Sequence, residues 1–226
     1  MTKQIHAFLR RHMESFVDAN GVKHDGPSLH GIAQAQYLGR SEIQVYRGLG
    51  DVLFYTSPKY RTQIAAQIMA QTAGLDPTYT IVPELDTVRR SKAYKSAMEV
   101  ATEGQGEDGI VAYCMNPDNN INGDHETETP GQLGERYLSH VHTLPRHFES
   151  LEDGQQMRIE SLAHEPGLTA VVMSLMNLRK YDEGMFKGAA RTAEPIHFTF
   201  EYSGRGNVIA ARMQYRDIQR TGTLRL

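Results

Sequence analysis

The sequence predicts an α/β fold: a mostly parallel sheet covered by helices on both faces. Up to residue 82, short apolar runs alternate with amphipathic segments, which is typical of layered β-α-β units. The runs are apolar throughout, as expected for parallel strands buried on both sides. Near the carboxyl end, two alternating runs flank a glycine-containing turn and predict a closing β-hairpin. We therefore expect one three-layer α/β/α domain spanning residues 1–226.

Composition limits the class of protein. Of the 226 residues, 39% are hydrophobic and 23% are charged, as in ordinary globular domains. The net charge of -3 gives no reason to expect nucleic acid or an anionic membrane as a partner. Cys114 is the only cysteine, which excludes an internal disulfide and fits a reducing compartment. Because no signal-peptide pattern is recognisable, we expect a cytoplasmic protein.

The first two predicted elements are a strand and a helix. Residues 5–9 form an apolar run bounded by polar residues, which is typical of a buried strand. A polar stretch that contains glycine follows. Apolar residues then recur at approximately helical spacing over residues 29–38, and Gly39 is a suitable C-cap.

The next elements continue the alternation. Residues 52–55 predict the second strand, and residues 60–73 are strong helix formers with one apolar face. Gly74 is expected to end that helix. A short strand follows at residues 79–82, which completes the β-α-β pattern.

Between residues 85 and 134 the alternation stops. A basic helical segment (88–101), an acidic glycine-rich stretch (103–109) and a polar loop (116–130) follow one another. We interpret residues 85–134 as an insertion over one end of the sheet.

The last part of the chain returns to regular elements. A helix is expected over residues 133–144, where Pro145 interrupts the pattern. A strand at 157–162 leads into an apolar helix at 168–176. Residues 196–202 and 208–215 alternate as two strands around the turn and form the closing hairpin.

Basic side chains follow three of the predicted strands where each strand ends. Arg11 and His12 follow the first strand, Arg61 lies at the start of a helix after the second, and His164 follows the third. The unpaired N–H groups of a helix N-terminus also favour an anion. Two arginines and two histidines at the carboxyl edge of one sheet indicate phosphoryl chemistry.

Four segments, in this order, resemble motifs of the histidine phosphatase (phosphoglycerate mutase-like) superfamily. FLRRHMES (8–15) is similar to the family's Arg-His-Gly-Glu-Ser/Thr element, and DGPSLHGIAQA (25–35) to its Asp-x-Pro-Leu-Thr-x-x-Gly-x-x-Gln-Ala helix start. TSPKYRTQIAA (56–66) resembles its Ser-Ser-Pro-x-x-Arg segment. SLAHEPGL (161–168) and the closing hairpin look closest to the bacterial phosphohistidine phosphatase branch. The resemblance covers most of the chain, except the insertion and residues 182–194.

The resemblance implies a role for each basic residue. His12 would attack phosphorus as a neutral imidazole and form a phosphohistidine that water hydrolyses. Arg11 and Arg61 would hold the non-bridging oxygens with their planar forks of donors. His164, protonated, would donate to the same oxygens. No metal or other cofactor is implied.

The proton donor for the leaving group is open at this stage. Glu84, directly after the strand at 79–82, is near the family's usual acid position and is our candidate. Residues 83–85 also resemble a segment of short phosphohistidine phosphatases that work without this acid. Rival carboxyl groups lie within the insertion: Glu107, Asp108, Glu126 and Glu128.

Two residues depart from the family pattern. Met13 replaces the glycine that usually follows the nucleophilic histidine, and its side chain is expected to crowd or line the pocket. Glu165 follows His164 where a small residue is common, and we place it with the phosphate-binding residues. A carboxylate there repels phosphate unless it points away or is protonated. Either departure indicates altered specificity or lost activity.

Two metal-like patterns carry no metal site in our interpretation. Residues 118–123 imitate the start of a calcium loop, but Thr129 occupies the place of the bidentate glutamate. His140 and His142 lie on different faces of their helix, which argues against a site that they share with His147.

The sequence therefore predicts a metal-independent phosphatase acting on a phosphorylated small molecule or a phosphoprotein, including protein phosphohistidine. A catalytically silent phosphate-binding module and a phosphoglycerate mutase-type phosphotransferase are the alternatives. Four basic residues of the insertion would attract an anionic substrate or form a solvated helix face: Arg89, Arg90, Lys92 and Lys95.

Overall fold

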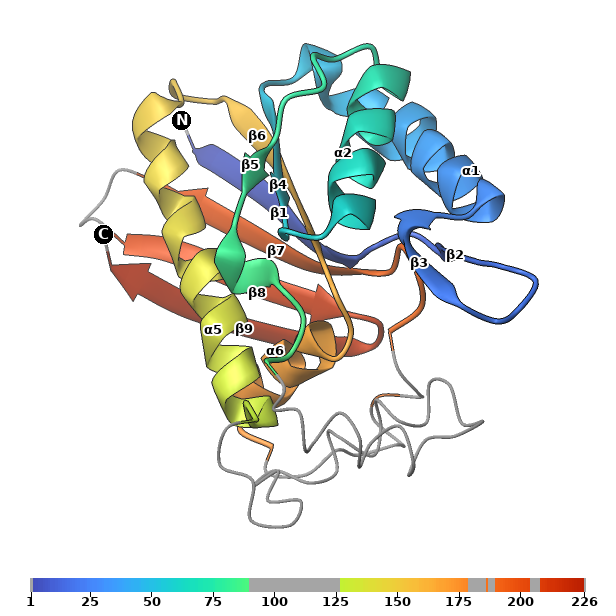
Figure 1. Ribbon diagram of the computed structural model, residues 1–226. Coiled ribbons are helices and arrows are strands. Elements are labelled where there is room, and N and C mark those ends of the chain that lie inside the picture. The colour runs from blue at the N-terminus through green and yellow to red at the C-terminus, as the bar shows by residue number, and fades with distance from the viewer. Residues whose placement is uncertain (1, 90–126, 179–185, 187–189, 204–207, 226) are drawn as a thin grey trace.

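The fold is built around one seven-stranded sheet (Figure 1). The computed structural model describes residues 2–89, 127–178, 186, 190–203 and 208–225. Strands β5, β4, β6, β1 and β8 run in one direction, and β7 and β9 run in the other, so the mostly parallel sheet is confirmed. In sheet order the strands are β5 (Thr80–Ile81), β4 (Val52–Thr56), β6 (Gln156–Ala163), β1 (Lys3–Arg11), β7 (Pro195–Tyr202), β8 (Val208–Tyr215) and β9 (Ile218–Arg225).

Helices cover both faces of the sheet, which confirms the three-layer α/β/α arrangement. On one face, α1 (Leu29–Leu38) and α2 (Tyr60–Thr72) pack together and bury a core against β4 and the end of β6. On the other face, α5 (Pro130–Thr143) and α6 (Gly167–Leu175) form the larger core with β1, β6 and β7.

The helix ends follow the capping rules. The Ser28 side chain accepts a hydrogen bond from the Gly31 N–H at the start of α1. Thr129 and Gln132 form a reciprocal capping box at the start of α5. Gly74, with φ of +72°, takes the left-handed conformation just after α2, where the sequence predicted a stop.

Gly39 is the C-cap of α1, as the sequence predicted. Its φ of -56° is right-handed, and the chain continues from α1 into a π-helical turn (Gly39–Ile43). A Cβ at this position would lie 2.6 Å from the carbonyl oxygen of Met69 on α2. Gly39 is therefore also needed for the close approach of α1 and α2.

Three strands were not predicted from the sequence. β2 (Ser15–Val17) and β3 (Lys23–Pro27) pair as a separate hairpin in the polar stretch after His12. β9 extends the closing hairpin to three strands. Most of the predicted insertion, including the helix at 88–101, the acidic stretch and much of the polar loop, lies outside the described residues.

A buried ion cluster fixes the π-helical turn to the sheet. Glu160 on β6 is fully buried and pairs with Arg10 at 2.8 Å and with Arg158 at 2.5 Å. Glu42 of the turn binds the same two guanidinium groups, at 2.6 and 3.1 Å. Because a buried charge needs partners, the cluster fixes the position of β1 next to Arg11.

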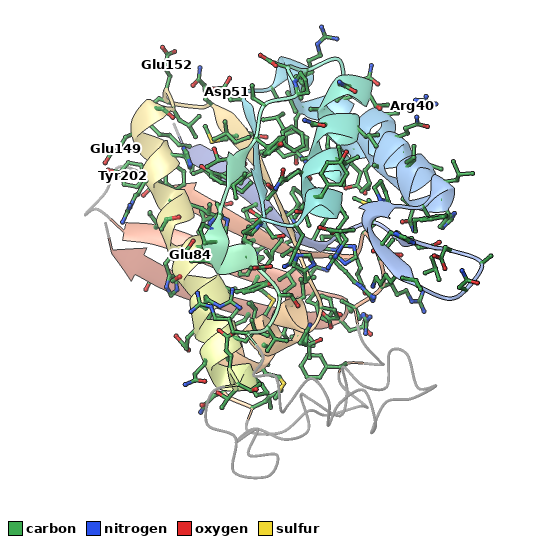
Figure 2. The ribbon with its side chains drawn as sticks, in the orientation of Figure 1. Arg40, Asp51, Glu84, Glu149, Glu152 and Tyr202 are labelled. Carbon is green, nitrogen blue, oxygen red and sulfur yellow. The ribbon has the colours of Figure 1, made fainter. Side chains whose placement is uncertain are left out.

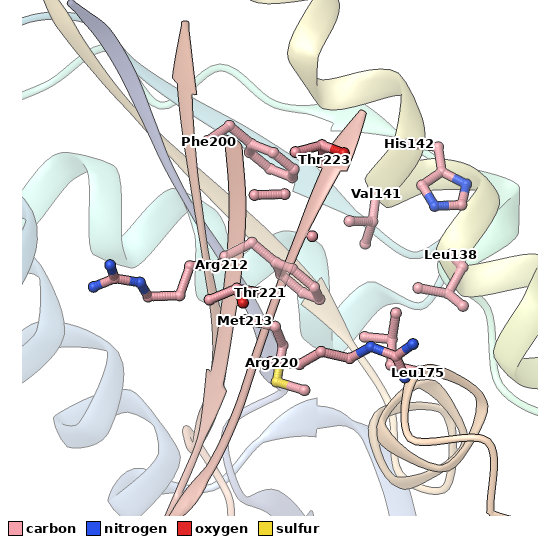
Figure 3. Close-up of a pocket in the computed structure, with 13 residues that line it drawn as sticks. Leu138, Val141, His142, Leu175, Phe200, Arg212, Met213, Arg220, Thr221 and Thr223 are labelled. Carbon is pink, nitrogen blue, oxygen red and sulfur yellow. The ribbon is translucent and has the colours of Figure 1, made fainter. Parts of the chain in front are cut away.

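The antiparallel half of the sheet and the helices beside it line an open, mostly apolar pocket of about 130 Å³ (Figure 3). Its wall comes from α5, the end of α6 and strands β7 to β9, with Arg220 and His142 among the polar residues that line it. The apolar lining residues include Leu138, Val141, Leu175, Phe198, Phe200 and Met213. Among the described helices, none is long and apolar enough to cross a membrane.

Candidate active site

The carboxyl ends of three neighbouring parallel strands meet at one edge of the sheet. β1 is paired with β6 up to Arg11, and the His12 N–H then donates to the Ala163 carbonyl at 2.9 Å. After β4, the Ser57 N–H donates to the Leu162 carbonyl at 3.0 Å. The structure thus brings the segments that carry His12, Ser57 and His164 side by side.

His12 is held as a neutral imidazole with a defined tautomer. Its ring is 5% exposed, and Nδ1 lies 2.5 Å from the Met13 carbonyl oxygen. A carbonyl can only accept, so Nδ1 carries the proton and Nε2 keeps its lone pair. Burial, and then the charge of Arg61, lower the pKa of His12 to about 3. The ring is therefore unprotonated at neutral pH.

His164 faces His12, with their ring centroids 5.0 Å apart. Its Nδ1 accepts from Nη2 of Arg61 at 3.1 Å, and its Nε2 lies 2.7 Å from the Ser57 hydroxyl. Arginine can only donate, so His164 is neutral, and burial together with the neighbouring His12 holds its pKa well below the usual value. The sequence-based expectation of a protonated His164 differs from this arrangement, because the ring is buried among cations.

Arg61 is oriented by a carboxylate from the β2–β3 hairpin. Its Nη1 donates to Asp25 at 2.9 Å, and the same carboxylate accepts from the Tyr60 N–H at 3.1 Å at the start of α2. The Nε of Arg61 is buried and has no hydrogen-bond partner among the described residues. A buried donor beside two imidazoles is suited to a phosphate oxygen.

Arg11 and two lysines complete the cationic rim. Nη1 of Arg11 donates to the Ala190 carbonyl. Lys23 extends from β3, and its pKa is lowered by desolvation and by the charges of Arg61 and Arg11. Lys59 lies 3.7 Å from Asp86. Both lysines help to lower the pKa of His164, so the sequence analysis missed two cations of the site.

The side chain of Met13 is directed away from the pocket. It is 1% exposed and belongs to the core between α1, α2 and the sheet. The expectation that it crowds or lines the pocket is therefore wrong. The loop packs tightly here, since a Cβ on Gly31 would lie 2.3 Å from the Glu14 carbonyl oxygen.

Glu165 is buried behind the site and is directed toward the protein interior. Its Oε1 accepts from the Thr169 hydroxyl and, at 3.1 Å, from the Ala190 N–H. Burial raises the pKa of this carboxyl group. Both hydrogen bonds involve Oε1 and run to α6 and to the chain that leads into β7, whereas Oε2 is buried with no hydrogen-bond partner among the described residues.

Glu84 lies beside α5 (Figure 2). It is exposed on a short 3₁₀ turn (Pro83–Leu85), and its carbonyl accepts from Arg136 at 2.5 Å. Burial lowers the pKa of His140 to about 4, and the negative charge of Glu84 partly offsets that shift. Asp86, two residues later, pairs with Lys59 at 3.7 Å.

The rival carboxyl groups are either engaged or outside the described residues. Glu128 forms a bidentate pair with Arg136, at 2.7 and 2.8 Å. Three other rivals lie outside the described residues: Glu107, Asp108 and Glu126. Of the basic residues of the insertion, Arg89 is described and is exposed; its backbone N–H donates to Glu128 at 3.1 Å.

Other histidines have structural partners. His140 lies 3.0 Å from the Ser161 hydroxyl, and His147 lies 2.7 Å from the Tyr55 hydroxyl. In the part of the chain that the structure describes, no group of three His, Cys, Asp or Glu side chains could hold a metal ion. The calcium-like segment at 118–123 lies outside that part.

Solved structures share this architecture. The mycobacterial glucosyl-3-phosphoglycerate phosphatase superposes with a TM-score of 0.62 at 15% identity, over 93% of this chain and 97% of that one. A phosphoglycerate mutase from Bacillus anthracis gives 0.60 at 11% identity, over 99% of this chain and 93% of that one. The chain has the histidine phosphatase fold. A structure described as mycobacterial hydrolase 1 gives 0.62 at 13% identity, over 97% of this chain and 100% of that one.

At these identities the histidine phosphatase fold is what the likeness shows, and the chemistry has to be argued from the site. No protein-family model matches the chain, and no curated protein sequence matches it significantly.

Proposed function

We propose that the protein is a metal-independent phosphatase that hydrolyses a phosphomonoester through a phosphohistidine on His12. One observation carries the proposal: the 2.5 Å contact from Nδ1 to the Met13 carbonyl leaves Nε2 as a lone-pair nucleophile within a ring of cations. The pKa of about 3 keeps this nitrogen unprotonated over the whole physiological range.

The first step transfers the phosphoryl group to the enzyme. Nε2 of His12 forms the N–P bond while the P–O bond to the leaving group breaks in line. Arg61 and Arg11 donate to the non-bridging oxygens and stabilise the charge of the transition state. His164 stays in contact with Arg61 at 3.1 Å and fixes the direction of that guanidinium group.

The leaving oxygen needs a proton, and we infer that Asp86 supplies it in place of Glu84. Asp86 lies 3.7 Å from Lys59, and the charge of Lys59 lowers the pKa of His164. The charge of Glu84 instead raises the pKa of His140, which is not one of the proposed site residues. In the second step, water attacks phosphorus and gives its proton to the Asp86 carboxylate. The N–P bond breaks, and inorganic phosphate leaves with His12 regenerated.

The favoured substrate is a phosphorylated small molecule in the cytoplasm. The glucosyl-3-phosphoglycerate phosphatase that shares the fold has a substrate of this class by its name. Protein phosphohistidine, suggested by the resemblance of residues 161–168, is the second substrate to test. Catalysis is favoured over the silent binding module, because Met13 packs in the core and Oε1 of Glu165 accepts from the Ala190 N–H.

The test is hydrolysis of para-nitrophenyl phosphate and of a phosphohistidine peptide, measured as phosphate release in EDTA. The wild-type protein is compared with His12→Ala and with His147→Ala, a control whose ring contacts Tyr55. Release that is lost only in His12→Ala supports the proposal. Equal rates in all three proteins, or no release from the wild type, contradict it. Transfer to an added phosphoglycerate in place of water would indicate the mutase alternative.

A further inference from the structure

We propose that Glu165 is a positioning residue that holds the Arg11 guanidinium in place through the peptide unit of Ala190. The proposal rests on the proposed function in one respect, since it takes Arg11 to be a ligand of the phosphoryl group. This role would explain why a carboxyl group directly follows His164, where a small residue is common in the family that the sequence resembles.

Ala190 is the link between the two charged side chains. Its N–H donates to Oε1 of Glu165 at 3.1 Å, and its carbonyl oxygen accepts from Nη1 of Arg11. The two hydrogen bonds therefore join Glu165 and Arg11 through one buried residue. Glu165 is itself fixed to α6, because the Thr169 hydroxyl donates to the same Oε1.

The chain that follows Ala190 is tied to Arg11 as well. The Arg11 N–H donates to the Glu194 carbonyl at 3.3 Å, and the Ala193 N–H donates to the Arg11 carbonyl at 3.2 Å. This segment thus runs beside the end of β1 and presents the Ala190 carbonyl to the guanidinium group. Without an acceptor at Glu165, the Ala190 N–H would be a buried donor with no partner, and the segment would move to satisfy it.

Hydrogen bonding and charge make opposite predictions for this carboxyl group. The charge of Arg11 lowers the pKa of Glu165, so the two groups interact electrostatically. The negative charge of an ionised Glu165 would therefore offset part of the positive charge that attracts phosphate. If Glu165 acted through its charge alone, any neutral residue would tighten anion binding. If it positions Arg11, then glutamine, which keeps an acceptor oxygen, preserves binding, and a residue without an acceptor weakens it.

The test measures binding of inorganic phosphate and orthovanadate by calorimetry, which requires no turnover. Glu165→Met, which keeps the volume of the side chain but has no oxygen, is expected to weaken binding about tenfold, as for the loss of one charge-assisted contact. Glu165→Gln is expected to bind as tightly as the wild type or more tightly. Thermal unfolding of each variant shows whether it is folded. A second variant, Thr169→Val, removes the hydrogen bond from the Thr169 hydroxyl to the Glu165 carboxylate and so releases the carboxylate from α6.

A double-mutant cycle with Arg11→Ala separates positioning from a general structural role. In the Arg11→Ala background, Glu165→Met should change the affinity less than about twofold, because the group through which it acts is absent. An equal loss in both backgrounds, or a Glu165→Gln variant as weak as Glu165→Met, overturns the proposal. Wild-type protein that binds neither anion overturns it too. Binding with the expected pattern but without hydrolysis leaves the positioning role intact and rejects the phosphatase.

Discussion

The two halves of the sheet differ in what their strand ends carry. In the parallel half, β4, β6 and β1 end side by side, and His12, Arg61 and His164 follow these ends directly or at the start of the next helix. In the antiparallel half, β7, β8 and β9 carry none of the proposed site residues and line an open, mostly apolar pocket with α5 and α6 (Figure 3).

This difference explains why the proposed chemistry is confined to one edge. Parallel strands place several carboxyl ends at the same edge, whereas antiparallel strands alternate their ends. The antiparallel half still contributes support, because the chain that leads into β7 starts next to the end of β1 and holds Arg11. Substitutions in the two halves should therefore separate activity from stability.

The largest contrast is expected between two arginines, one from each half. Arg61→Ala removes a guanidinium group from the phosphoryl site and should lower kcat about 10²- to 10³-fold, by analogy with the loss of one transition-state donor. Arg220→Ala, on β9 at the pocket, should leave kcat within about twofold. Steady-state kinetics with para-nitrophenyl phosphate check both; similar losses in the two variants would remove the proposed division.

The next contrast lies inside the parallel half, between two carboxyl groups. Asp86→Asn should lower the rate about 10²-fold with alkyl phosphates, whose leaving groups need a proton. Its effect with para-nitrophenyl phosphate should be smaller, because that leaving group is a weaker base. Glu84→Gln is the matched control and should change neither rate. The reverse order would restore Glu84 as the acid.

Lys23 should give a smaller effect, which appears in KM. Its ammonium group faces the cations Arg61 and Arg11, so it is expected to bind a substrate anion. Lys23→Met should raise KM about tenfold, with Lys23→Arg close to the wild type. The raised KM should be less marked in high salt, and a KM that is unchanged in Lys23→Met would exclude Lys23 from the site.

The smallest contrast concerns the pH dependence of stability. Burial lowers the pKa of His12 to about 3 and that of the partly exposed His197 on β7 to about 4. The unfolded chain binds these protons near pH 6.5, so stability is greatest above that pH and falls as the pH decreases. His12 contributes up to about 1.4 kcal/mol per pH unit below 6.5.

Urea unfolding at several pH values measures this slope. His12→Asn should reduce it, and His197→Asn should reduce it less because the ring of His197 is more exposed. A slope that is unchanged in His12→Asn would show that this ring is not buried as a neutral group.

The sequence predicted the elements around the candidate site because their signals are local. The three strand ends, the helix from residue 60 and the stop at Gly74 each depend on a few adjacent residues. The β2–β3 hairpin depends on pairing within a polar stretch, and so Lys23 was missed. β9 was missed because QRTGTLR (219–225) is polar and contains a glycine.

The orientation of side chains was beyond the reach of the sequence. Met13 and Glu165 each follow a site histidine directly, and no pattern along the chain shows that both point into the interior. The same holds for Glu84, which is near the expected position in the sequence but lies beside α5. These outcomes depend on tertiary packing, which a motif does not encode.

The most direct test of the central claim is detection of the covalent intermediate. Protein mixed with a phosphomonoester is quenched in alkali, where phosphohistidine persists, and its peptides are analysed by mass spectrometry. The account predicts one added phosphoryl group on the peptide that contains His12, and none in His12→Ala. Hydrolysis that proceeds with no phosphorylated His12 in the wild type, or a phosphoryl group carried by His164 instead, would contradict it.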